Sequence, residues 1–435
     1  MSPQVTNSIS LKDALRFVVD NRGKTAPASK SGHKLIATNC INNTNLYPIY
    51  ENVRYVSQHT YETWFRAHPE PFDIILTNKG SQNGAVCLVP EVVDFCIAQD
   101  MMALRADESK IDPLFLFAAL RSKPVQSAIK GLNVDGVIPH FKKTDFDKLL
   151  LPLPDRAEQE RIGIIHFDLC SKIELNRRTN ETLEAMAQAI FKDWFVDFGP
   201  VRRKMQGETK PSAIMGGLIQ DSAKATELAT LFPDALGAND LPEGWVERTI
   251  DDDFDVVMGQ SPPGDTYNET GDGLPFFQGR RDFGWRFPSR RVFCNQPNRI
   301  SRSDWTLVSV RAPVGDINRA WEECCIGRGV GAFMHRSSLG SFTYYVGLHL
   351  REVLASYDND GTVFGSINQK QFKGLTLAGA NTELSHVFDD LIMPIDAQIR
   401  SLTGQSQTLV QARDYLLPKL MSGEIRASDT RNLVA

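Results

Sequence analysis

Two segments of the chain carry an apolar residue at nearly every seventh position, a spacing typical of long helices that bury one narrow seam against a partner. The first seam runs from residue 162 to 190 and the second from residue 388 to 416. The predicted interface of a helix pair consists of Ile162, Leu169, Ile173, Leu183, Ile190, Phe388, Ile395, Leu402, Leu409 and Leu416. Because one such helix cannot bury its seam alone, the simplest partner for each is the other.

Local signals mark the limits of the first helix. Asp155 follows Pro154 and stands three residues before Glu158, which predicts an N-cap with a capping-box-like pair. Gly199 and Pro200 predict the end of the helix, because glycine terminates helices and proline cannot continue them.

The second helix is predicted to begin after Asn381 or Thr382, either of which can act as an N-cap. Two residues inside it disturb the pattern. Pro394 should kink the helix, and Gly404 should weaken it by about 1 kcal/mol. The first half of this helix is therefore expected to be less regular.

One polar residue, Asn176, occupies the middle position of the first seam, and Leu402 occupies the middle of the second. In an antiparallel pair the two would lie close together, where a buried asparagine can fix the register of the helices. Alternatively, Asn176 lies at the edge of the seam and reaches water. The second reading is favoured because the Leu402 side chain offers no hydrogen-bond partner.

The chain also contains an internal repeat. A shift of 226 residues carries the apolar members of the first seam onto the second, and it carries "FKKTDFDKLLLPL" onto "INQKQFKGLTLAG". With a slightly different shift, "DIILTNKGSQNG" meets "DWTLVSVRAPVG" and "CIAQ" meets "CIGR". The pattern indicates one unit used twice, each a globular region followed by a helix.

Short β-type runs such as "FDIILTN" (72–78) and "GAVCLVP" (84–90), with a helical run "PLFLFAALRS" (113–122), predict mixed globular regions. The expected fold is α+β, with two mixed α/β domains, two long antiparallel helices packed like a coiled coil, and a pseudo-two-fold repeat. The expected organisation is domain one (1–154), helix one (155–199), connector (200–240), domain two (241–380), helix two (381–425) and tail (426–435).

Composition narrows the class of protein. The 435 residues are 42% hydrophobic with a net charge of −5, which is ordinary for a globular multidomain chain. No run is long and apolar enough to cross a bilayer, and the N-terminus lacks a signal-peptide core. The seven cysteines show no C-x-x-C spacing, so neither a zinc site nor a disulfide framework is expected. We expect a cytoplasmic protein without a bound metal.

Three segments carry a family resemblance: "LPLPDRAEQERI", "KIELNRRTNETLEAMAQAIFKDWFVDFGPV" and "LLPKLMSGEIR". They resemble the helical regions of the specificity subunit of type I restriction–modification systems, and "LPEGW" (241–245) resembles the opening of its target recognition domains. The middle of the second helix, "QIRSLTGQSQ", is less charged than the first helix, so the two helices are expected to present different surfaces to a partner.

The resemblance implies a DNA-binding subunit without catalytic activity. Each recognition domain would read one half of a split double-stranded target, and the helices would set the gap and dock partners. Those partners would be two adenine methyltransferase subunits, which hold S-adenosylmethionine, and a restriction subunit where the system has one. No cofactor is then expected in this chain.

Local basic and polar clusters are the candidate DNA contacts, because arginine and lysine suit phosphates and guanine, and asparagine and glutamine suit adenine. The sharpest cluster is "FFQGRRDFGWRFPSRR" (276–291), and the repeat adds two pairs of equivalent loops. The candidates are Lys79, Ser81, Gln82, Lys142, Lys143, Gln278, Arg280, Arg281, Arg286, Arg290, Arg311, Asn368, Gln369 and Lys370. Solvated loops and plain turns are the alternative explanation.

Enzyme motifs are missing from the sequence. "SPPG" (261–264) lacks the polar and aromatic residues of an adenine methyltransferase motif, and "GRGVG" (327–331) is better explained as a tight turn than as a cofactor loop. "ECC" (323–325) has no further clustered metal ligands and fits a strand interior. The alternatives are a self-contained DNA adenine methyltransferase and a coiled-coil scaffold with no nucleic-acid role.

Overall fold

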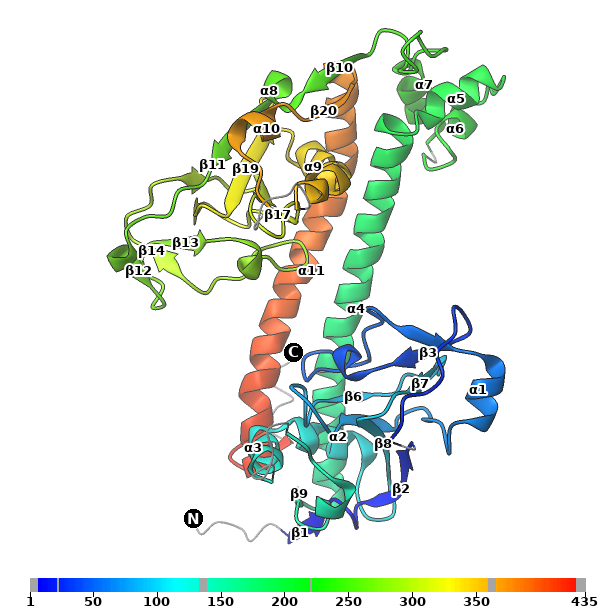
Figure 1. Ribbon diagram of the computed structural model, residues 1–435, viewed down its shortest axis with the longest axis vertical. Coiled ribbons are helices and arrows are strands. Elements are labelled where there is room, and N and C mark those ends of the chain that lie inside the picture. Colours follow the sequence, from blue (N-terminus) through cyan, green and yellow to red (C-terminus); the bar gives the residue numbers. More distant parts are fainter. Residues whose placement is uncertain (1–6, 22, 133–138, 220, 359–364, 428–435) are drawn as a thin grey trace. The chain divides into compact units, whose positions relative to one another are not determined.

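The computed structural model describes residues 7–21, 23–132, 139–219, 221–358 and 365–427 (Figure 1). It divides into two compact units. The first unit combines residues 1–179 with 402–435, and the second unit is residues 180–401. Each unit therefore contains a globular region and a part of both long helices, α4 (Arg156–Phe195) and α11 (Thr382–Ser422). The predicted α+β class and the two long helices are confirmed.

The first unit is built on a four-stranded antiparallel sheet in the order β2 (Leu15–Asp20), β8 (Met101–Ala106), β5 (Ile74–Thr77), β6 (Val86–Leu88). A second sheet places β3 (His33–Ile36) between β4 (Arg54–Val56) and the parallel β7 (Phe95–Ile97). A separate pair joins β1 (Asn7–Ser10) to β9 (Leu150–Leu153). The helices of the globular region are α1 (Gln58–Thr63), α2 (Pro113–Arg121) and α3 (Lys123–Gly131).

The second unit repeats this scheme with β11 (Phe254–Met258), β19 (Val330–His335), β16 (Thr306–Ser309) and β17 (Ile317–Arg319) in antiparallel order. Its second sheet has the order β12 (Tyr267–Asn268), β14 (Phe293–Cys294), β13 (Leu274–Phe277), β18 (Cys324–Ile326), β15 (Ile300–Ser301), with β13 and β18 parallel. A separate pair joins β10 (Val246–Thr249) to β20 (Thr376–Gly379). The helices that follow β10 in this globular region are α8 (Ile250–Asp253), α9 (Gly340–Ser356) and α10 (Gln369–Lys373).

The main strand pairings of the two units correspond, and the second unit adds β12 and β15 to its second sheet. The antiparallel pair β1·β9 matches β10·β20, the parallel pair β3·β7 matches β13·β18, and the order β2-β8-β5-β6 matches β11-β19-β16-β17. The sequence segments that aligned at a nearly constant shift supply three of these equivalences: β5 with β16, β7 with β18, and β9 with β20. The strand runs around residues 75 and 87 and the helical run at 113–121 are also found where the sequence predicted them.

The long helices begin where the capping residues predicted. The Asp155 carboxylate accepts a hydrogen bond from the backbone N–H of Glu158 at 2.9 Å, and Asn381 Oδ1 accepts one from Leu384 at 2.7 Å. The predicted end of the first helix is wrong by four residues, because α4 stops at Phe195. Pro200 instead lies in the first turn of α5 (Gly199–Met205). Backbone N–H groups in a first turn have no acceptor within the helix, so proline, which lacks this group, fits there.

The predicted disturbance of the second helix does not interrupt it, since α11 continues through Pro394 and Gly404 to Ser422. Pro394 and Asp390, whose carbonyl loses its usual N–H partner, both lie on the exposed side of the helix. Water can therefore hydrogen-bond to the freed carbonyl, which limits the cost of the proline.

The favoured reading of Asn176 is wrong. Asn176 is buried in the first unit, with 1% of its surface exposed, and does not reach water. Its Nδ2 donates to Gln405 Oε1 at 2.8 Å and to Ser406 Oγ at 3.2 Å. The sequence argument considered only Leu402, which faces Asn176 in the register, and overlooked the polar residues one turn further along α11. α4 and α11 thus run antiparallel in this unit and are joined here by side-chain hydrogen bonds.

Replacing Asn176 with alanine is expected to lower the free energy of unfolding by about 1–2 kcal/mol, because it removes a buried hydrogen-bonded side chain and leaves a small void. Urea unfolding followed by circular dichroism measures the change. The matched control is Lys172→Ala, an exposed position of the same helix that should change the value by less than about 0.5 kcal/mol. If both variants change the free energy of unfolding equally, the contacts of Asn176 do not stabilise the unit as expected.

The segment predicted to be a connector is folded. It forms α5, α6 (Pro211–Ile214) and α7 (Ser222–Thr230). Apolar residues of this segment, including Ile214, Leu228 and Phe232, belong to the same buried cluster as Trp194 of α4. Basic residues of the run 201–204 ("VRRK") form ion pairs within the unit: Arg203 pairs with Asp193 at 2.7 Å and Lys204 pairs with Asp234 at 2.9 Å.

Candidate nucleic-acid interface

Two of the predicted DNA-contact loops lie side by side in the first unit. Lys79 forms a β-bridge with His140, Gly80 N–H donates to the carbonyl of Pro139 at 3.0 Å, and Phe141 N–H donates to that of Asn78 at 2.8 Å. These bonds bring together the residues Lys79, Ser81, Gln82, Lys142 and Lys143 from the two loops. The last four side chains are exposed. The loops therefore present one polar surface with three lysines.

The equivalent loops of the second unit are joined in the same way. Arg311 forms a β-bridge with Ser366, and Ile367 N–H donates to the carbonyl of Val310 at 3.1 Å. The chain then enters α10, where Asn368 and Gln371 make a reciprocal capping box with two 3.0 Å bonds. The Asn368 side-chain oxygen Oδ1 thus caps its own helix.

The exposed side chains that remain beside Arg311 are Gln369 and Lys370, in the first turn of α10. No ion pair of Arg311 occurs among the described residues. The local surface combines a cation from each loop with one amide group, a composition that suits a phosphate backbone and base edges.

The basic run at 276–291 does not form a single surface. Gln278, Arg280 and Arg281 are exposed at the end of β13. Arg280 pairs with Asp316, which stands in the loop that follows Arg311, so this end of the run lies beside the Arg311 loop. Arg290 instead pairs with Glu322 between β17 and β18. The run therefore places part of its charge near the other candidate loops and part elsewhere in the second unit.

The prediction that Arg286 contacts DNA is wrong. Its guanidinium has no exposed surface: Nη1 donates to the Glu184 carboxylate at 2.7 Å and Nη2 donates to Asp396 at 2.5 Å. The centre of the Tyr344 ring lies 4.1 Å from the guanidinium carbon. Burial raises the pKa of Glu184 above its usual value, although the adjacent Arg286 opposes this. The arginine cluster in the sequence gave no sign that one member turns inward to pair with the helices.

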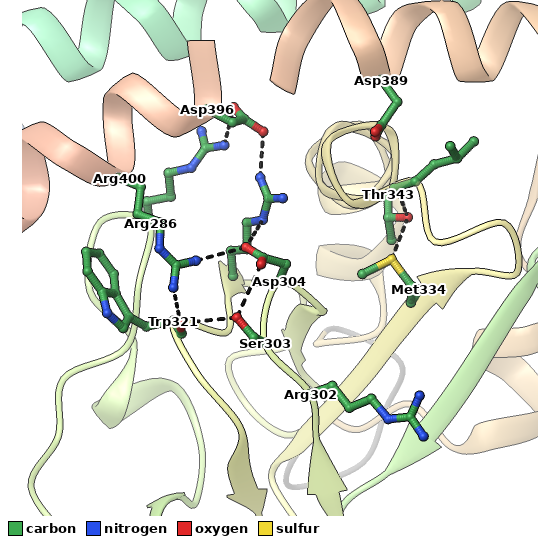
Figure 2. Close-up of polar contacts among 12 residues, drawn as sticks. Arg286, Arg302, Ser303, Asp304, Trp321, Met334, Thr343, Asp389, Asp396 and Arg400 are labelled. Atoms are coloured by element: carbon green, nitrogen blue, oxygen red, sulfur yellow. Dashed lines mark hydrogen bonds and ion pairs between the residues drawn. The ribbon is translucent and has the colours of Figure 1, made fainter. Parts of the chain in front are cut away.

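Further ion pairs surround this one within the second unit. Figure 2 shows Asp396 and Arg286 pointing toward each other, and Arg400 joined to Asp304 and to the carbonyl of Trp321. Arg319 donates to the second oxygen of Asp396 at 2.6 Å. Asp396 and Arg400 belong to α11, so charged contacts attach the globular region of this unit to its part of α11.

The residues predicted to pair the helices are distributed over both units. Ile162, Leu169 and Leu416 are buried in the apolar cluster of the first unit, and Leu409 packs against it. Ile190 and Phe388 are buried in the cluster of the second unit, and Ile395 packs against it. The side chains of Ile173, Leu183 and Leu402 are half-buried.

Other classes of site find little support in the described part of the chain. All seven cysteines are free and buried, and Cys324 and Cys325 lie within β18. No group of three histidine, cysteine, aspartate or glutamate residues in the described ranges is arranged to hold a metal ion. Among the described helices, none combines the length and apolar character needed to cross a membrane.

Comparisons with known proteins find similarity to specificity subunits. The family model of the type I restriction modification DNA specificity domain matches residues 28–185. The chain is 27% identical over 361 residues to a putative type I restriction enzyme MjaX specificity subunit of Methanocaldococcus jannaschii, covering 81% of this chain and 78% of the relative. It is 24% identical over 396 residues to the type I restriction enzyme HindI specificity subunit of Haemophilus influenzae, covering 81% and 86%.

A solved structure supports the fold. The type I restriction–modification system S subunit from M. genitalium is similar with a TM-score of 0.60 at 15% identity, covering 97% of this chain and 99% of that one. The similarity supports the arrangement of strands and helices.

Proposed function

The chain belongs to the family of specificity subunits of type I restriction–modification systems, and we propose that it reads a split DNA target, one half with each unit. The observation that carries this proposal is the twofold use of one strand scheme with chemically different loops. Lys142 and Lys143 in the first unit correspond to Asn368 and Gln369 in the second under the 226-residue shift. Two units that share a scaffold but differ in their loop side chains suit a DNA target whose two halves differ in sequence.

Electrostatics support the same proposal. The whole chain is acidic, with a net charge of −5, yet the joined loops of each unit gather lysine and arginine. Such cations would replace counterions on the DNA phosphates, so binding should weaken steeply with salt. Recognition domain one would comprise residues 1–154 and recognition domain two residues 241–380.

The helices would act as the spacer. In this proposal α4 and α11 set the gap between the half-sites and dock two methyltransferase subunits, with a restriction subunit where the system has one. S-adenosylmethionine and all bond-making chemistry would belong to those partners, and the complex would act on DNA in the cytoplasm. The antiparallel contacts of α4 and α11, such as Asn176 with Gln405, favour a fixed spacing.

An exchange of domains tests the proposal. The chain is expressed with its modification subunit in a host that lacks adenine methylation, and methylated adenines are mapped across the genome. A split motif with a constant gap is expected. Replacing residues 1–154 with the first domain of another family member should change one half of the motif, and replacing 241–380 should change the other. If either exchange changes both halves or neither, the assignment of domains to half-sites is wrong.

A further inference from the structure

In each unit one turn lies beside the candidate DNA-contact loops. In the second unit it is the turn Gly327–Arg328–Gly329, between β18 and β19. Gly327 N–H donates to the carbonyl of Phe277 at 2.8 Å, and Gly329 N–H donates to that of Gln278 at 3.1 Å. The Gly329 carbonyl in turn accepts from Val310 N–H at 3.0 Å. The turn is thus held between the end of β13 and the end of β16.

The backbone is packed closely around this turn. A Cβ atom on Gly329 would lie 2.3 Å from the carbonyl oxygen of Gln278, and one on Gly259 would lie 2.2 Å from that of Gly327. Only glycine fits at such contacts. The glycines of "GRGVG" therefore serve a tight turn, as the sequence indicated, and they fix the backbone on both sides of Arg328.

Arg328 is exposed at the tip of this turn. Among the described residues it forms no ion pair, in contrast to Arg280, Arg290 and Arg291. Its backbone N–H donates a hydrogen bond to Ser261 Oγ at 3.4 Å. Its backbone is thus held in place, and the guanidinium remains available to an outside ligand beside the Gln278 and Arg311 loops.

The first unit has an equivalent residue, Gln99, in the turn between β7 and β8. Ala98 N–H donates to the carbonyl of Ile36 at 2.9 Å, as Gly327 does to Phe277. The Asp100 carbonyl accepts from Asn78 N–H at 3.0 Å, as that of Gly329 does from Val310. The two flanking bonds match, so Gln99 and Arg328 hold the same place in the two units. Gln99 Oε1 accepts a hydrogen bond from Thr25 at 3.1 Å, which orients its amide.

We infer that Arg328 and Gln99 are specificity-determining residues, Arg328 reading a guanine in one half-site and Gln99 an adenine in the other. This inference rests on the proposed function. A guanidinium donates two hydrogen bonds to guanine O6 and N7, and a glutamine amide both accepts from N6 and donates to N7 of adenine. The two turns are equivalent in position but carry different side chains. They can therefore give the two half-sites different base preferences although the scaffold is the same.

Methylation mapping of the complex with its modification subunit tests the inference. Arg328→Gln should lower the preference for guanine at one position of one half-site by roughly 10- to 100-fold, and the other half-site should not change. Gln99→Arg should alter one position of the other half-site. The matched control is Arg302→Gln, an exposed arginine of the second unit outside the candidate loops, which should leave the motif unchanged.

Each other outcome decides against the inference. If Arg328 contacts only phosphate, Arg328→Gln will lower methylation evenly at all sites and preserve the motif. If the variant complex methylates the original motif with the original selectivity, Arg328 reads no base. A complex of the unaltered chain that methylates without a split motif would overturn the proposed function and the inference together, which separates that failure from the previous two.

Discussion

Replacing Arg286 with methionine is expected to lower the free energy of unfolding of the second unit by about 3–5 kcal/mol. The guanidinium is fully buried and is paired with Glu184, whose side chain is 15% exposed, and with Asp396, whose side chain is 4% exposed. Methionine fills a similar volume but leaves both carboxylates without this partner. A buried charge that loses its partner costs far more than the pair contributed.

Urea unfolding followed by tryptophan fluorescence measures this effect, because five of the six tryptophans (all except Trp64) lie in the second unit. Urea is preferred to a salt denaturant, which would screen the charges. The matched control is Arg290→Met, which breaks an exposed pair with Glu322 and should cost less than about 1 kcal/mol. Adding Glu184→Gln to Arg286→Met should recover part of the loss. A change below 1 kcal/mol in Arg286→Met would refute the anchoring role of this residue.

Acid is expected to destabilise the first unit through His166. This side chain is buried on α4 against Phe117 of α2 and Cys170 of α4, and burial lowers its pKa to about 3, with Arg121 and Arg413 acting in the same direction. In the unfolded chain its pKa is near 6.5. Below that value the unfolded chain takes up a proton that the folded unit does not, so stability falls as the pH drops from about 6.5 toward 3. At pH 5 the loss is about 2 kcal/mol relative to pH 8.

The variant His166→Gln stays neutral at every pH and isolates this contribution. The difference in unfolding free energy between the unaltered chain and the variant should shrink by about 2 kcal/mol between pH 8 and pH 5. Urea unfolding at the two pH values, with protection of first-unit amides from hydrogen exchange as the probe, provides the measurement. His59→Gln, at an exposed position of α1, is the control and should retain the full dependence on pH. If the free energy of unfolding of His166→Gln falls with pH as steeply as that of the unaltered chain, the prediction is wrong.

Local chemistry in the sequence was enough to predict part of the fold. Asp155 caps α4, and the buried run at 74–77 forms a strand, because a cap and an apolar strand depend on residues close in the chain. Arg286 could not be placed, because its direction is decided by Glu184 and Asp396, which are 102 and 110 residues away in the chain. Asn176 was misplaced for the same reason, since its partners lie on the other long helix.

The candidate DNA-contact loops were likewise only partly predictable from the sequence. Internal repetition indicated which loops of the two halves are equivalent, and in each unit a β-bridge, at Lys79 or at Arg311, joins the same two loops. The sequence could not separate Arg280 and Arg281 from Arg290, because an arginine-rich run gives no information about which side of a loop each residue faces. Arg328 was overlooked because its turn looks like a plain strand connection until the bonds to Gln278 and Val310 are known.

The first unit contains residues from both ends of the chain, and this affects the order of folding during synthesis on the ribosome. Residues 180–401 are contiguous, so the second unit can complete its core while translation continues. The first unit lacks Leu416, Leu417 and Leu420, which are buried with Ile162 and Leu169, until the last part of the chain emerges. The globule made first therefore finishes folding last, and a nascent chain released early would carry a complete second core beside an open first one.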